Sequence, residues 1–214
     1  MGAGLWQQMD HEEGRHVLIR ARAGGFGLIE LMVAVSILAI LGAVGLPSLI
    51  DWVRNARMRT VAEALLFGVR LTQSEAQRRM HTVVFFRTDS KDCTPASTAS
   101  KSGLYWQIRV VPDALQPGDT ADVVQCGVLT DVSSGVLLSS KTTALCFGGD
   151  GRQKAQMDPA GIGASCTPGP VRYDVTLGEN KRAGDRSLRL LVTLAGSVRL
   201  CDPDKSAKAP DGCR

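Results

Sequence analysis

Residues 24–50 read GGFGLIELMVAVSILAILGAVGLPSLI, and this stretch decides how the rest of the chain is interpreted. From Leu31 to Ile50 it contains no charged residue. A helix over these residues would be roughly 30 Å long, which matches the apolar thickness of a bilayer. A secretory signal peptide has a shorter apolar region with its small-residue cleavage site behind it. Here Gly24 and Gly25 precede the apolar run, so the sequence predicts a retained membrane helix.

Glu30 is the acidic residue at the start of this apolar segment. An ionised carboxylate in apolar surroundings is unfavourable unless a positive group pairs with it. Cleavage between Gly25 and Phe26 would create an ammonium group at Phe26, which could pair with Glu30 of the same or a neighbouring chain. Two interpretations are open at this point: a processed subunit, or a transmembrane helix with one interfacial glutamate.

The helical pattern continues to residue 80 but changes character. Apolar residues recur at three- and four-residue steps, with arginines and glutamates on the opposite side, which is typical of an amphipathic helix packed on a domain. Pro47 removes a helix hydrogen bond and predicts a kink. The expected apolar face consists of Trp52, Val53, Ala56, Val61, Ala64, Leu65, Gly68, Val69, Leu71 and Thr72.

After His81 the sequence becomes typical of β-structure, and no internal repeat is visible. The expected strands are β-branched or alternating and are bounded by turn-rich stretches. They cover residues 82–88, 104–111, 122–129, 135–138, 144–147, 171–177, 187–194 and 197–201. The predicted fold class is therefore α+β: a long kinked N-terminal helix packed on antiparallel sheets. Its expected parts are a leader (1–25), a membrane-spanning half-helix (26–53), an amphipathic half-helix (54–80) and a β domain (81–214).

Six cysteines lie beyond residue 90, without a CxxC pair and without a histidine nearby in sequence, so no metal site is expected. Their even number predicts disulfides in an oxidising compartment; buried free thiols in a cytosolic domain are the alternative. Turn-forming residues between Cys201 and Cys213 favour a bond between these two. Among the fifteen connectivities that six cysteines allow, the preferred remaining pairs are Cys146 with Cys166 and Cys93 with Cys126.

The chain carries no GxSxG, HExxH or Walker A motif, so neither an enzymatic activity nor a cofactor is expected. The net charge of +4 is too small to indicate a polyanionic partner without a local cluster.

The string GFGLIELMVAVSILAILGAVGLPSL resembles the class III signal of type IV pilins and type II secretion pseudopilins. In that family a prepilin peptidase cuts after the glycine and methylates the new N-terminal residue. Here the glycine is Gly25 and the new N-terminal residue is Phe26. Glu30 and Pro47 fall where the family pattern places an assembly glutamate and a kink. The leader of 25 residues is longer than is usual in the family, so translation could start at Met9 or later.

Two further stretches, RNARMRTVAEALLFGVRLTQSEAQRRMHTVVF and GSVRLCDPDKSAKAPDGC, resemble the FimT/GspH group of minor pilins and pseudopilins. The resemblance implies a minor type IV pilin that acts in pilus assembly or priming, adhesion, twitching motility or DNA uptake. It also implies a single-pass inner-membrane protein with a cytoplasmic N-terminus and a periplasmic domain, which joins other pilins through its N-terminal helix. A GspH-like pseudopilin of type II secretion, and an anchored periplasmic binding protein that never polymerises, are the alternatives.

Some FimT-like pilins bind DNA through a Gly-Arg-x-Arg stretch near the C-terminus. The matching residues here are Gly196-Ser197-Val198-Arg199, so Arg199 is retained and the first arginine is replaced by Ser197. The resemblance implies DNA as a partner through Arg199. Residues 181–214 also contain eight basic and four acidic residues, so Arg189, Arg186 and Arg182 could contact DNA phosphates with it. The alternative is a solvated basic edge that prevents strand aggregation.

Overall fold

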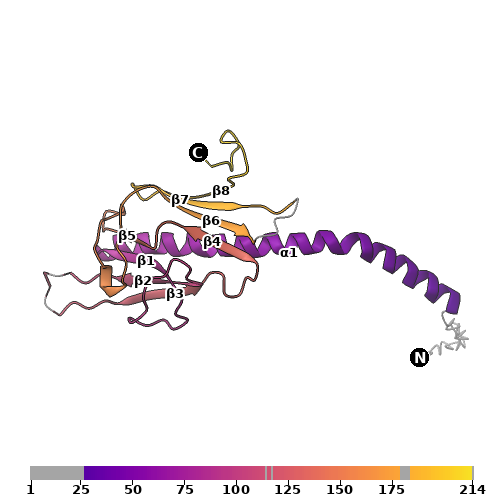
Figure 1. Cartoon of the computed structure of the whole chain (residues 1–214), viewed down its shortest axis with the longest axis horizontal. Coiled ribbons are helices and arrows are strands. Elements are labelled where there is room, and N and C mark those ends of the chain that lie inside the picture. The colour runs from indigo at the N-terminus through magenta and orange to yellow at the C-terminus, as the bar shows by residue number, and fades with distance from the viewer. Residues whose placement is uncertain (1–26, 114, 117, 179–183, 214) are drawn as a thin grey trace, which may run out of the picture. The chain divides into compact units, whose positions relative to one another are not determined.

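The computed structural model describes residues 27–113, 115–116, 118–178 and 184–213. One helix, α1 (Leu28–Arg79), precedes eight strands (Figure 1). Each strand lies within one of the segments expected from the sequence or extends it by two residues. The strands are β1 (Val83–Thr88), β2 (Tyr105–Val110), β3 (Val123–Val128), β4 (Val136–Ser140), β5 (Ala144–Phe147), β6 (Val171–Leu177), β7 (Leu188–Val192) and β8 (Val198–Cys201).

The chain divides into two compact units, at Val44 and Gly45. Apart from Gly27, the described part of the first unit is helical. The second unit contains the remainder of α1 and all eight strands. It corresponds to the α+β architecture that the sequence predicts, a helix packed on antiparallel sheets.

The strands form two antiparallel sheets, with the orders β3-β2-β1-β5 and β4-β6-β7-β8. The core lies between their inner faces and the second half of α1, whose residues Met58, Val61, Leu65 and Val69 are at most 2% exposed. Gly68 allows the helix to approach the first sheet closely, because a Cβ atom there would lie 2.8 Å from the ring of Phe85.

The apolar face of α1 begins later than the sequence predicts. Trp52 is 69% exposed, Val53 is 36% exposed, and Ala56 is also exposed, whereas Met58 is 2% exposed. The expectation that Trp52, Val53 and Ala56 belong to the buried face is therefore wrong. The helical period continues through these residues, but in the described structure the sheets cover the helix only from about Met58 onward.

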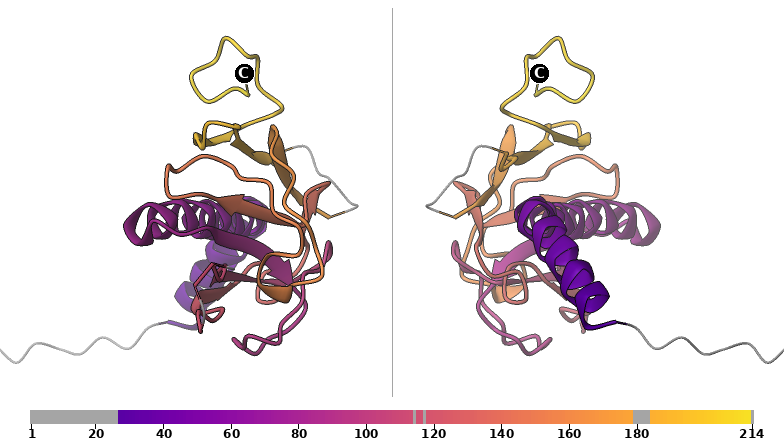
Figure 2. Two further views of the ribbon diagram at one scale, coloured as in Figure 1. Left: turned by 90° about the vertical axis from the view of Figure 1, so that its left-hand side faces the viewer. Right: turned by 90° about the vertical axis from the view of Figure 1, so that its right-hand side faces the viewer.

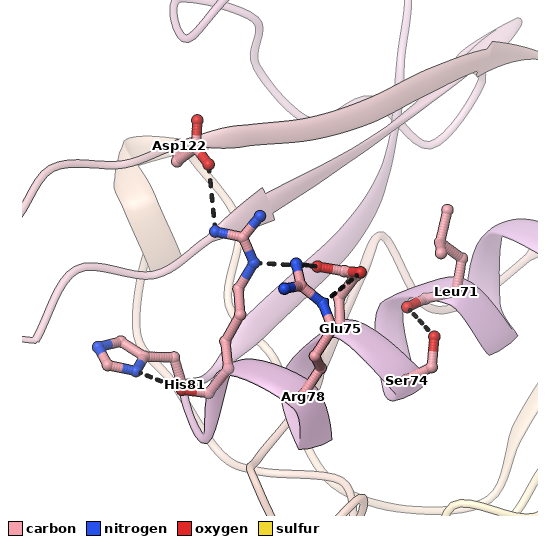
Figure 3. Close-up of polar contacts among 7 residues, drawn as sticks. Leu71, Ser74, Glu75, Arg78, His81 and Asp122 are labelled. Carbon is pink, nitrogen blue, oxygen red and sulfur yellow. Dashed lines mark hydrogen bonds and ion pairs between the residues drawn. The ribbon is translucent and has the colours of Figure 1, made fainter.

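The end of α1 is fastened to the first sheet by charged side chains (Figure 3). Glu75 accepts hydrogen bonds from Arg78 at 2.6 Å and from Arg79 at 2.9 Å, and Arg79 also reaches Asp122 at 3.3 Å. The two guanidinium groups lower the pKa of Glu75 to about 2. The ion pairs thus connect the last turn of the helix to the residue preceding β3.

The outer face of the first sheet is covered by loops. Val84 and Phe86 of β1, fully buried, pack there in a second apolar cluster with Ile162. The buried guanidinium of Arg109 lies 5.2 Å from the centre of the Phe86 ring. It donates hydrogen bonds of 3.1–3.2 Å to the carbonyl oxygens of Thr94, Ser97 and Ala160. One arginine thereby holds the two long loops, residues 89–104 and 148–170, over this sheet, and its burial lowers its pKa.

Three disulfides join Cys93 to Cys126, Cys146 to Cys166, and Cys201 to Cys213, with Cα–Cα distances of 5.8, 5.7 and 5.1 Å. These are the pairs preferred from the sequence. The third bond closes the C-terminal segment that follows β8, seen in yellow in Figure 2.

Candidate filament-assembly segment

The N-terminal part of α1 leaves its apolar side chains uncovered. The described large hydrophobic residues from Leu28 to Ile50 are 52–79% exposed, on every side of the helix. Burying apolar surface is favourable by about 25 cal/mol per Å², and an exposed patch of this kind marks a site that contacts lipid or another protein. The segment therefore requires an apolar partner.

Within the described residues, no single helix has the length and apolarity of a membrane span. Two helical segments of α1, Leu28–Ala43 and Ser48–Arg79, meet the criterion of length and composition when taken together. The break between them includes Pro47, and the kink expected there from the sequence remains a prediction.

Glu30 is exposed in the first turn of α1. Its backbone N–H donates to the carbonyl oxygen of Gly27 at 3.0 Å. A carboxylate is favoured in a first turn because the helix N-terminus carries partial positive charge. In the described part of the chain, no basic side chain lies within ion-pair distance of Glu30. Gly25 and Phe26, the expected cleavage and methylation sites, lie outside the described residues.

Residues 20–46 match the prokaryotic N-terminal methylation motif. Over 124 residues, the chain is 32% identical to a fimbrial protein of Moraxella nonliquefaciens, covering 56% of this chain and 75% of that protein. The chain belongs to the type IV pilin family. Pilins are structural proteins without enzymatic activity. This agrees with the expectation, based on the lack of enzyme motifs in the sequence, that the chain is not an enzyme.

Two crystal structures of the type IV minor pilin FimU from Pseudomonas aeruginosa are also similar to this pilin. The sequence identities are 17% and 18%, and the TM-scores are 0.44 and 0.41. The matches cover 73% of this chain and 95% and 99% of the FimU chains.

The basic residues near the C-terminus of the pilin do not form one continuous stripe. Arg189 and Arg199 share the outer face of the second sheet, but Arg189 bonds Asp174 of the neighbouring strand at 2.5 Å. Arg186 lines a groove beside α1 instead. Arg182 lies outside the described residues.

Arg172, which was not expected from the sequence to belong to this surface, is brought near Arg199 by the sheet register. Both residues are exposed and pair with Leu191, from the two sides of β7. The alternating burial along β6 is the signal that could have identified Arg172 as an outward-facing residue.

Proposed function

We propose that this pilin is a minor subunit of a type IV pilus, stored in the inner membrane and then assembled into the filament through the first half of α1. The uncovered apolar side chains of Leu28–Ile50, within a matched methylation motif, are the observation that carries the proposal. Lipid covers these side chains before assembly, and the helices of other pilins cover them in the filament.

Processing by a prepilin peptidase is the first step of the proposed pathway. Cleavage after Gly25 removes the leader, and methylation of Phe26 leaves a basic amine at the new N-terminus. The domain beyond residue 54 is periplasmic, which agrees with its three disulfides. The processing step accounts for the position of the glycines before the apolar run.

Glu30 has an assembly role in this proposal. The exposed carboxylate has no basic partner among the described residues, and an apolar filament core would make an unpaired charge costly. An ammonium group at Phe26 of a neighbouring subunit supplies the missing charge. Glu30 would thus favour the incorporation of subunits that have been processed and whose Phe26 amine lies beside its carboxylate.

The processing step is tested by intact-mass measurement on the protein extracted from its native membrane. We expect the mass of a chain that begins at N-methylated Phe26, and we expect Gly25→Arg to leave the leader attached. An N-terminus beyond residue 50 in the native protein would exclude the pilin pathway.

The assembly step is tested by measuring incorporation into sheared filaments. Glu30→Ala should be processed and inserted normally but incorporated poorly, because the Phe26 amine then lacks its partner. Glu63→Ala is the matched control, since Glu63 lies on the same helix, is exposed and pairs with Arg59 of its own chain at 2.7 Å. Equal incorporation of the two variants would show that Glu30 is only an interfacial residue.

The filament system is identified by deleting the gene. Loss of surface pili with normal protein export supports the pilus subunit. Defective export with normal pili would instead assign the chain to type II secretion, as a pseudopilin.

A further inference from the structure

A groove of about 650 Å³ lies in the domain between the residues of α1 that precede the core and the strands β7 and β8. Its apolar lining comes from Trp52 and Ala56 of the helix, Leu188 of β7 and Leu200 of β8. All of these residues belong to the second compact unit. The groove is therefore a feature of the folded domain itself.

Trp52 places this groove next to the end of the uncharged segment. It follows Ile50 by two residues and is 69% exposed, although it is among the largest apolar side chains in the protein. An indole combines an apolar ring with one N–H donor, and tryptophan is enriched where a membrane meets water. Trp52 is thus a side chain suited to the headgroup level of a bilayer.

The rim of the groove carries both signs of charge. Arg59, Arg186 and Asp211 are exposed there, whereas Asp202 is 8% exposed and accepts a hydrogen bond from the backbone N–H of Asp204. Arg59 pairs with Glu63, and Asp211 pairs with Lys205, which keeps the surrounding charge balanced. Exposed pairs of this kind contribute about 0–1 kcal/mol each, so a ligand can replace them at little cost. A balanced rim fits a ligand that itself carries a positive and a negative group.

We propose that the groove binds zwitterionic phospholipid headgroups at the outer surface of the inner membrane and holds the domain against the membrane before assembly. The inference rests on the proposed function, which places the preceding apolar segment in the bilayer. The lipid phosphate contacts Arg59 and Arg186, the lipid ammonium contacts Asp211, and the Trp52 indole lies at the interface.

The main competing occupant is the apolar helix of a second copy. That helix has no charged residue between Leu31 and Ile50, so it would cover the apolar lining but offer no charged group to the rim. A headgroup satisfies both the lining and the rim, because its glycerol and acyl region lies directly beside its charges. The groove chemistry therefore favours lipid.

The test uses the full chain in nanodiscs of phosphatidylethanolamine doped with a nitroxide-headgroup lipid, observed by NMR of methyl-labelled leucines. We expect the Leu188 and Leu200 signals to broaden several-fold more than that of Leu137, which is 50% exposed on the outer face of the second sheet. Equal broadening of all three, or none at the groove leucines, would overturn the proposal.

Two variants sharpen the test. Trp52→Ala should reduce the broadening at Leu188 and Leu200. Phe67→Ala removes another exposed aromatic side chain of α1 (52%) that does not line the groove, and it should leave the broadening unchanged. Broadening that grows with protein concentration in discs without nitroxide would identify a second copy as the occupant and overturn the lipid assignment.

Alkaline extraction of the same chain separates this inference from the proposed function. A chain that alkali releases from membranes contradicts membrane storage, and with it both proposals. A chain that stays in the membrane while its groove leucines do not respond contradicts the lipid-binding groove alone.

Discussion

The outer face of the first sheet is covered by loops, whereas the outer face of the second sheet is exposed. The first sheet carries a second apolar cluster there, closed by two long loops, a buried arginine and the Cys146–Cys166 disulfide. The second sheet shows alternating burial along β6, and its outward side chains include Arg172 and Arg199. The first face thus contributes to stability, whereas the second is free to meet solvent or a partner.

The largest expected difference between the two faces is in stability. Phe86→Ala should lower the free energy of unfolding by about 3–5 kcal/mol, because it empties a fully buried position under the loops. Leu137→Ala, on the outer face of the second sheet and 50% exposed, should lower it by less than about 1 kcal/mol. Urea unfolding of both variants measures the contrast, and similar losses would show that both faces are covered in solution.

A second contrast concerns two arginines on the outer faces. Arg109→Met should lower the unfolding free energy by about 2–4 kcal/mol, because three loop carbonyl oxygens lose a charged donor. Arg172→Met should change it by less than about 0.5 kcal/mol, because Arg172 is exposed. Hydrogen exchange across residues 94–99 reports the loop directly. Unchanged protection there in Arg109→Met would mean that the disulfides alone hold the loops.

Much of this arrangement follows from local sequence patterns. Alternation and β-branching placed all eight strands. The turn between β7 and β8 contains Gly196, which has a φ of 89°. The covering of the first sheet could not be predicted in this way. Arg109 occupies an outward position in a strand, and only the return of residues 94–97 and 160 over that face makes it a buried residue.

The same limit applies to the assembly segment and to the basic residues. Helical periodicity placed Trp52 and Ala56 on the side of the core, but a period does not show where the covering sheets begin. Charge counting grouped Arg189 with Arg199, whereas pairing across strands gives Arg189 the carboxylate of Asp174. Both differences depend on contacts between distant parts of the chain.

Acid should weaken the attachment of α1 to the first sheet. Glu75 has a folded pKa of about 2, below its ordinary value of 4.5, so it contributes stability above pH 4.5 that is lost as the pH falls toward 2. Glu75→Gln should lower the unfolding free energy at neutral pH by about 1 kcal/mol and flatten its decline across this range.

Glu63→Gln is the control for this pH dependence. Its pair with Arg59 has side-chain exposures of 73% for the arginine and 54% for the glutamate, so its loss should hardly change stability. Unfolding curves at closely spaced pH values between 5 and 2 compare the two variants. Parallel profiles for Glu75→Gln and the wild type would contradict the role given to the Glu75 carboxylate.

The smallest expected effect concerns DNA on the uncovered face of the second sheet. Arg199 is exposed there and donates to the carbonyl oxygen of Gly212 at a long distance of 3.4 Å, so its guanidinium can exchange that contact for a phosphate. We expect weak duplex binding without sequence preference that is lost between about 50 and 200 mM salt.

Arg199→Gln should weaken this DNA binding a few-fold, and Ser197→Arg, two residues away on the same side of the strand, should strengthen it. Arg189→Gln should have less effect than Arg199→Gln, because Asp174 already balances the Arg189 charge. Gel-shift titrations at low salt with the full chain in neutral detergent rank the three variants. No shift for either the wild type or Ser197→Arg would remove DNA from the partners of this face and leave it as a solvated edge of the filament subunit.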